Sequence, residues 1–222
     1  MNQNYTLTQP SESTLVINKV LRNTYLLLGV CFLFSSAMAA FALVTNAPPL
    51  GIIITLVGVY GLMFATHALS NSGWGLVAVL AFTGFLGYTI GPILNFYMTN
   101  FSNGSQLVMT ALGATGIIFF GLSGYALTTR KDFSYLSGFL FVGVLVAFLA
   151  ILANIFLNIP GLQLAISAAF VLISSGLILF QTSAIINGGE RNYIVATVTL
   201  FVALYNLFLS LLQLFAAFSG RD

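Results

Sequence analysis

Residues 130–157 read RKDFSYLSGFLFVGVLVAFLAILANIFL, which is three charged residues followed by a long apolar run without a charge. About 20 apolar residues in an α-helix cross the hydrocarbon core of a bilayer, which is about 30 Å thick. Because a charge at the bilayer centre costs about 2.5–3.5 kcal/mol, charged residues are expected at the ends of spans. The stretch therefore predicts a transmembrane helix that follows a short charged connection.

In the rest of the chain, too, every charged residue falls in a short gap between apolar runs or near a terminus. Charged residues make up 5% of the sequence and hydrophobic residues 59%, with a mean hydropathy of +1.05, whereas soluble domains carry about 25% charged residues. The runs lack the alternation of outer-membrane barrel strands. We therefore predict an all-α membrane protein, a bundle of seven transmembrane helices in the lipid bilayer, at residues 24–45, 50–69, 75–98, 107–127, 134–157, 161–185 and 193–218.

The basic residues predict the orientation of the bundle. With seven spans, five of the six share one side: Lys19, Arg22, Arg130, Lys131 and Arg191. By the positive-inside rule this side is the cytoplasm, which places the N-terminus inside and the C-terminus outside. A last segment that enters and returns on one side is the alternative, and it would move only the C-terminal Arg221 and Asp222.

The N-terminal residues 1–22 are polar and predict a cytoplasmic tail ahead of a transmembrane domain at 23–222. Residues 1 to about 18 show no strong helical period until Leu15 and are expected to lack structure. Lys19 and the following apolar run resemble a signal peptide. However, the apolar run does not end at a cleavage site, as that of a signal peptide would, but continues to Val44, so an uncleaved first span is favoured.

The composition excludes several classes of function. The connections leave no room for a soluble domain, and the net charge of +2 without a basic patch predicts no nucleic-acid binding. A single cysteine, Cys31, and a single histidine, His67, predict no internal disulfide, no metal site and no cofactor. Gly121-Leu122-Ser123-Gly124 matches the nucleophile motif of rhomboid-type intramembrane proteases. Their serine needs a histidine base, which follows the serine in the chain of those proteases. His67 instead precedes Ser123 and lies at the predicted cytoplasmic rim, so no enzyme activity is expected.

Glycines recur at close spacing in three of the predicted spans. Small residues let helix backbones approach each other closely, so we expect these glycines to mark helix–helix contacts. Pro92 lies within the third span and should kink or break its helix. The glycines are Gly58, Gly61, Gly84, Gly87, Gly91, Gly113, Gly116, Gly121 and Gly124.

Uncharged polar residues also fall at membrane depth or near its edges. Hydrogen bonds between helices, worth about 0.6 kcal/mol each, are their ordinary use. A permeation path is the alternative, with Gln181 and Asn206 as the first pair to test. The candidate polar contacts are Asn95, Asn154 and Asn206, together with Asn158, Gln163, Gln181 and Gln213.

The third span resembles the signature of the Bax-inhibitor transmembrane family through Gly87-x-x-Ile90-Gly91-Pro92-x-Leu94. Ala111-x-x-x-Thr115 and the apolar residues after it continue the resemblance. It implies a seven-helix bundle with a cytoplasmic N-terminus, in agreement with the distribution of charge. The candidate signature and packing residues are Gly84, Gly87, Gly91, Pro92 and Leu94.

Some members of this family are calcium leak channels gated by two aspartates, and the resemblance places Gln181 and Ala203 at the matching positions. An amide and a methyl group cannot titrate as an acidic pair does. An ion or small-solute channel without this acidic gate is therefore the alternative function.

Motifs at 19–25, 56–64, 127–132 and 188–194 resemble the bacterial inner-membrane branch of the family that modulates the FtsH protease. This resemblance implies a protein that binds FtsH, with HflK and HflC as further partners, and that restrains the degradation of other membrane proteins. The polar tail, Asn2-Gln3-Asn4-Tyr5-Thr6, is the segment we expect the protease to engage, with the chain acting as a slowly processed substrate. The sequence leaves the oligomeric state open.

Overall fold

A computed structural model describes the chain except for residues 1–8, 158 and 221–222. The described residues form helices without strands, and seven of these helices are long and apolar enough to cross a membrane. The predicted seven-helix transmembrane bundle is confirmed, and the helix bounds differ from the predicted spans mainly at the ends. The helices are α1 Gln9–Val44, α2 Ile52–Leu69, α3 Trp74–Asn100, α4 Gly104–Thr129, α5 Leu136–Leu157, α6 Pro160–Ile186 and α7 Tyr193–Ser219.

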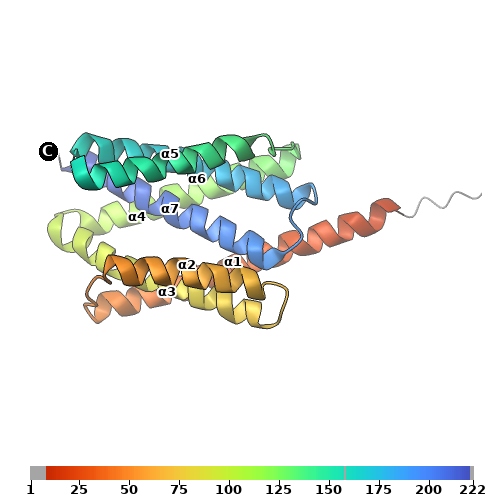
Figure 1. The fold of residues 1–222 in the computed structure, drawn as a ribbon, viewed down its shortest axis with the longest axis horizontal. Helices are drawn as coiled ribbons and strands as arrows, with labels where there is room; N and C mark the ends of the chain where they lie inside the picture. The colour runs from red at the N-terminus through yellow and green to blue at the C-terminus, as the bar shows by residue number, and fades with distance from the viewer. Residues whose placement is uncertain (1–8, 158, 221–222) are drawn as a thin grey trace, which may run out of the picture.

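The helices run alternately up and down the bundle, with α7 at its centre (Figure 1). Helix α7 contacts α1, α2, α3, α4 and α6. Helices α1, α2 and α3 lie on one side of it and α5 and α6 on the other, while α5 contacts α6 alone among the described helices. The described helices therefore form a central helix α7, a group of three, α1 to α3, on one side of it, and α6 with the outlying α5 on the other, while α4 contacts α3, α6 and α7.

Helix α7 occupies the centre because its sequence combines small and large apolar residues. Ala196, Ala203 and Ser210 recur every seven residues and are all buried, which lets neighbouring helices approach closely. Between them, Phe201 and Leu207 are 1% and 0% exposed and fill the space around the helix. The same helix therefore supplies both close contacts and the largest share of the apolar core.

The outlying helix α5 exposes large apolar side chains, whose contact with water would be unfavourable and whose contact with lipid would not. In α5, Phe139 and Phe156 are 70% and 86% exposed. Large exposed apolar surfaces are unfavourable in water but suit contact with acyl chains. The exposed surface agrees with the composition in placing the bundle in a bilayer.

Helix α1 is longer than the predicted first span. It has 36 residues and is therefore about 54 Å long, and its first part extends beyond the bundle (Figure 1). The prediction that residues up to about 18 lack structure is wrong from Gln9 onward, while residues 1–8, including the candidate tail Asn2–Thr6, lie outside the described residues. Extending an existing helix needs no new nucleus, and Pro10 near its start has no hydrogen bond to lose.

The structure differs from two expectations about single helices, α3 and α7. Helix α3 continues through Pro92, so the predicted break does not occur. Helix α7 is about 40 Å long at 27 residues and runs the length of the bundle, so α1 begins and α7 ends at opposite ends (Figure 1). The alternative of a last segment that returns to its starting side is wrong.

Candidate functional site

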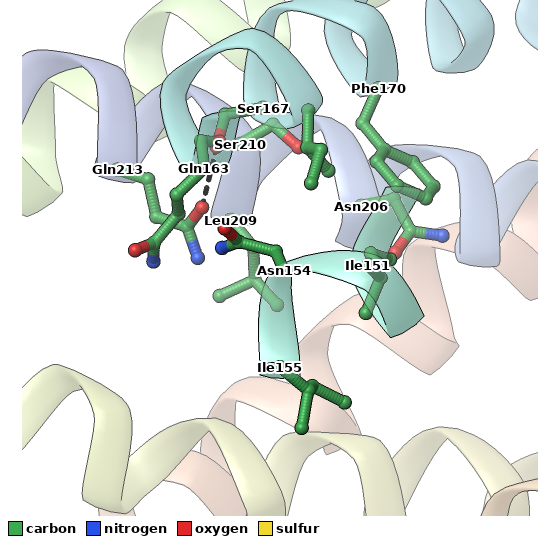
Figure 2. Close-up of a pocket in the computed structure, with 11 residues that line it drawn as sticks. Ile151, Asn154, Ile155, Gln163, Ser167, Phe170, Asn206, Leu209, Ser210 and Gln213 are labelled. Carbon is green, nitrogen blue, oxygen red and sulfur yellow. Dashed lines mark hydrogen bonds between the residues drawn. The ribbon is translucent and has the colours of Figure 1, made fainter. Parts of the chain in front are cut away.

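A polar cavity of about 460 Å³ lies among α5, α6 and α7. Helices α5 and α7 both contact α6, but within the described part of the chain they make no contact with each other. The cavity therefore lies in the cleft between α5 and α7, with α6 joining its walls (Figure 2). It is lined by Ile151, Asn154, Ile155, Gln163, Ile166, Ser167, Phe170, Asn206, Leu209, Ser210 and Gln213.

Six of the lining residues are polar, and none of the described lining residues carries a charge. The hydroxyl of Ser167 donates to Oε1 of Gln213 over 2.6 Å. The backbone N–H of Ile159 donates to Oδ1 of Asn154 over 3.1 Å. The amides of Asn154, Gln163 and Gln213 lie close together on one side of the cavity, and Asn206 lies further along it (Figure 2). The cavity thus offers neutral donors and acceptors and no acid, base or counterion.

The cavity spans the half of the bundle that is predicted to face outward. Asn206 stands at the centre of α7, which runs from Tyr193 to Ser219, whereas Gln213 lies two turns nearer its end. Gln163 lies in the first turn of α6, beside the α5–α6 connection. Polar groups therefore extend from the middle of the bundle toward the end at which the chain terminates.

The structure brings two of the three candidate polar contacts together and separates the third. Asn154 and Asn206 line the cavity, whereas Nδ2 of Asn95 donates to Oδ1 of Asn46 over 3.4 Å at the α1–α2 connection. Ser167 and Ser210 were not singled out from the sequence. Their spacing could have indicated that they accompany the predicted polar residues. Ser167 follows Gln163 by four residues and Ser210 follows Asn206 by four, which places each pair on one helix face.

The two positions that match the family's acidic gate lie outside this cavity. Gln181 is 5% exposed and Ala203 is fully buried, and Nε2 of Gln181 has no hydrogen-bond partner among the described residues. The Ser167–Gln213 hydrogen bond sets the register of α6 against α7. By this register Gln181 lies roughly 10 Å along the bundle from Asn206.

Close apolar packing separates these two polar regions. Ile178 of α6 and Leu200 of α7 are both fully buried in the main core cluster. The structure therefore does not join Gln181 and Asn206 into a continuous polar path.

The signature glycines of α3 face α1. A methyl group added at Gly87 would overlap the backbone carbonyl of Ser35, and one at Gly91 would lie 2.5 Å from Cβ of Ala42. A methyl group at Gly84 would overlap the ring of Phe34. These glycines allow α1 and α3 to approach as closely as they do, while Pro92 and Leu94 are half-buried beside them.

The glycines of α4 have a different environment. Within the described residues, no neighbouring atom lies within 4 Å of a methyl group placed at Gly113, Gly116, Gly121 or Gly124, and the same holds for Gly61 of α2. The prediction that these glycines mark helix contacts is wrong. Helix α4 instead packs through its opposite face, which includes Leu107, Ala111, Thr115 and Phe119.

The structure also separates the residues of the hydrolase hypothesis. Ser123 is buried in α4, whereas His67 is exposed on α2 with Nδ1 3.0 Å from the carbonyl oxygen of Met63. Helices α2 and α4 make no contact over their described lengths. A histidine at that position cannot serve as a base for Ser123.

Comparison with known sequences identifies the family. The profile described as inhibitor of apoptosis-promoting Bax1 matches residues 17–220. The chain belongs to the Bax-inhibitor family. Membership confirms the resemblance carried by the α3 signature, and the matched range covers all seven helices except the start of α1.

Several bacterial proteins are similar to this chain over nearly their whole lengths. The Escherichia coli K12 protein named modulator of FtsH protease YccA is 52% identical over 210 residues, covering 95% of this chain and 94% of that protein. An uncharacterised protein of Pseudomonas aeruginosa is 51% identical over 220 residues, covering 99% of both chains. An uncharacterised membrane protein of Vibrio cholerae is 42% identical over 220 residues, covering 98% of both.

Proposed function

We propose that this protein resides in the bacterial inner membrane, binds the membrane-anchored ATP-dependent protease FtsH and restrains its degradation of other membrane proteins. The observation that carries the proposal is the 52% identity to the Escherichia coli modulator over 95% of the chain. Because this identity extends along almost the whole chain, it includes the bundle and its connections rather than one shared motif. HflK and HflC, proteins associated with FtsH, are further partners in this proposal.

The proposed orientation has the N-terminus in the cytoplasm. The α4–α5 connection, which carries Arg130 and Lys131, lies beside the end of α6, because Ser183 donates to the carbonyl oxygen of Lys131 over 3.0 Å. The α6–α7 connection carries Arg191, and Asn192 after it donates to Oδ1 of Asn71 in the α2–α3 connection over 3.0 Å. These connections share the end at which α1 begins, and their basic residues support a cytoplasmic position for it.

The shape of the bundle supports a mechanism of slow processing. Helix α1 extends from the proposed cytoplasmic end, where the tail Asn2–Thr6 precedes it, and would present an end for an ATP-driven protease to engage (Figure 1). Pulling on α1 would have to separate it from α3 at their closest contacts and from the central α7. Regions with dense buried contacts open at the highest free-energy cost. A protease occupied by such a substrate degrades other substrates more slowly.

The test is a degradation assay in lipid vesicles that contain purified FtsH and a membrane-protein reporter. Adding this protein should lengthen the half-life of the reporter severalfold. Deleting residues 2–8, which precede the described part of α1, should remove most of this protection, while deleting 221–222 should not. An unchanged half-life with the full chain would contradict the proposal, and full protection by the 2–8 deletion would exclude engagement through the tail.

An ion or small-solute channel is the second candidate, because the polar cavity reaches the middle of the bundle. The packing around Ile178 and Leu200 closes the path beyond Asn206. A channel must pass solute in vesicles that contain no partner protein, whereas a protease modulator need not. We expect no flux of calcium or of small neutral solutes above empty vesicles, at either pH 6 or pH 8.

A further inference from the structure

The cavity among α5, α6 and α7 contains hydrogen-bonding groups without partners in the described structure. The side-chain amides of Gln163 and Asn206 make no hydrogen bond to another described residue, and the amide N–H groups of Gln213 are likewise free of described acceptors. Gln163 is exposed at the outer end of the cavity, whereas Asn206 and Gln213 are half-buried, and an unpaired amide is costly in the middle of the bundle, where bulk water is absent. An acyl chain in the cavity would leave these groups unpaired, so the occupant must itself donate and accept hydrogen bonds.

The lining also excludes a charged occupant. Its polar groups are amides and hydroxyls, and no described lining residue could neutralise an ion. A charge buried without an opposite charge pays its desolvation cost without compensation. Amides present a donor and an acceptor side by side, which matches an uncharged amide or hydroxyl group.

The remaining walls suit an apolar body attached to such a group. Ile151 and Ile155 of α5 are 38% and 57% exposed, and Ile166, Phe170 and Leu209 complete the apolar lining. Ile155 points away from the neighbouring amides of Asn154, Gln163 and Gln213 (Figure 2). A volume of about 460 Å³ falls within the range of about 300–1,000 Å³ that small-molecule sites occupy.

We propose that this cleft is a binding site for an uncharged amphiphile. Its amide or hydroxyl head group lies among Asn154, Asn206 and Gln213, and its apolar chain lies against Ile151 and Ile155 of α5. This inference does not depend on the protease proposal, since it rests on the lining of one cavity. The two can fail separately, because ligand binding is measured without any protease.

The test uses the purified full chain in phosphatidylcholine nanodiscs and a fatty primary amide that carries a photoactivatable diazirine near its head group. Mass spectrometry should map the label to residues 151–170 and 206–213. An unlabelled fatty primary amide and a monoacylglycerol should each reduce labelling at least fivefold. The fatty-acid methyl ester and the ionised fatty acid of the same chain length should not compete.

Two variants connect the labelling to the cavity. Asn206→Leu should reduce labelling at least fivefold, because it removes the amide at the inner end of the cleft. Asn95→Leu is the matched control, since it removes an asparagine in the same half of the bundle but outside the cavity. It should label as the unmodified chain does, and both variants are first checked for an unchanged elution profile in detergent.

Three results would overturn the inference. Equal competition by the methyl ester would mean that the cleft holds lipid chains without selecting a head group. Equal labelling of Asn206→Leu and the unmodified chain would place the probe elsewhere. Labelling that no competitor reduces would mean that the probe attaches without selective binding in the cleft.

Discussion

Helices α3 and α4 follow each other in the chain and both carry glycines on one face, yet they use them differently. Gly84, Gly87 and Gly91 of α3 form the surface on which α1 packs, while the glycines of α4 lie away from any described neighbour. Helix α4 packs through larger residues on its other face. A row of small residues therefore shows where a helix could approach closely, and only the neighbouring helices determine whether it does.

The largest expected difference between the two helices comes from Gly87→Leu. A methyl group at this position already overlaps the carbonyl of Ser35, so a leucine must force α1 and α3 apart. We expect the free energy of unfolding to fall by about 3 kcal/mol, the upper part of the range for overpacking. Gly116→Leu in α4 is the control and should not lower it, because its Cβ meets open space and leucine favours the helix over glycine. Denaturation in detergent measures both, and equal losses would remove the distinction between the helices.

Alanine substitutions test whether the free energy of unfolding changes in opposite directions for the glycines of α3 and of α4. Gly91→Ala should destabilise by about 1–2 kcal/mol, because the new methyl group meets Cβ of Ala42 at 2.5 Å. Gly113→Ala should stabilise by about 0.5–1 kcal/mol, because alanine restricts the unfolded chain and favours the helix. Paired denaturation curves decide the matter, and a shift of the same sign in both variants would contradict the assignment of the two faces.

A smaller effect is expected where α7 meets the α2–α3 connection. The side-chain oxygen of Asn192 accepts from the backbone N–H groups of Ile194 and Val195, and its amide donates to Asn71. Asn192→Ala should destabilise by about 1 kcal/mol through loss of the cap. Asn192→Ser keeps a capping oxygen but cannot bridge to Asn71. Its loss of stability should therefore be only a few tenths of the loss in Asn192→Ala. If serine proves as costly as alanine, the bridge rather than the cap stabilises this end.

The sequence predicts the spans well because one large energy term controls them. The cost of a charge in hydrocarbon keeps the apolar runs free of charged residues, and every predicted span lies within a few residues of an observed helix, apart from the start of α1. That start was missed because polar residues outside the membrane carry no such penalty, and helix extension there depends on weak propensities.

The candidate site could be predicted only in part. Asn154 and Asn206 stand out as polar residues in apolar runs, but their meeting in one cavity depends on how α5 and α7 pack on α6. The separation of Gln181 from Asn206 follows from the register of α6 against α7, which no local pattern specifies. The role of each glycine likewise depends on which helix face meets a neighbour.

The most direct test of the account measures the reporter and this protein together in vesicles with FtsH. The unmodified chain and Gly116→Leu should persist and lengthen the half-life of the reporter equally. Gly87→Leu, with α1 and α3 forced apart, should itself be degraded several times faster and protect the reporter correspondingly less. Protection by Gly87→Leu equal to that of the unmodified chain, despite its faster degradation, would contradict the claim that the closely packed bundle restrains the protease.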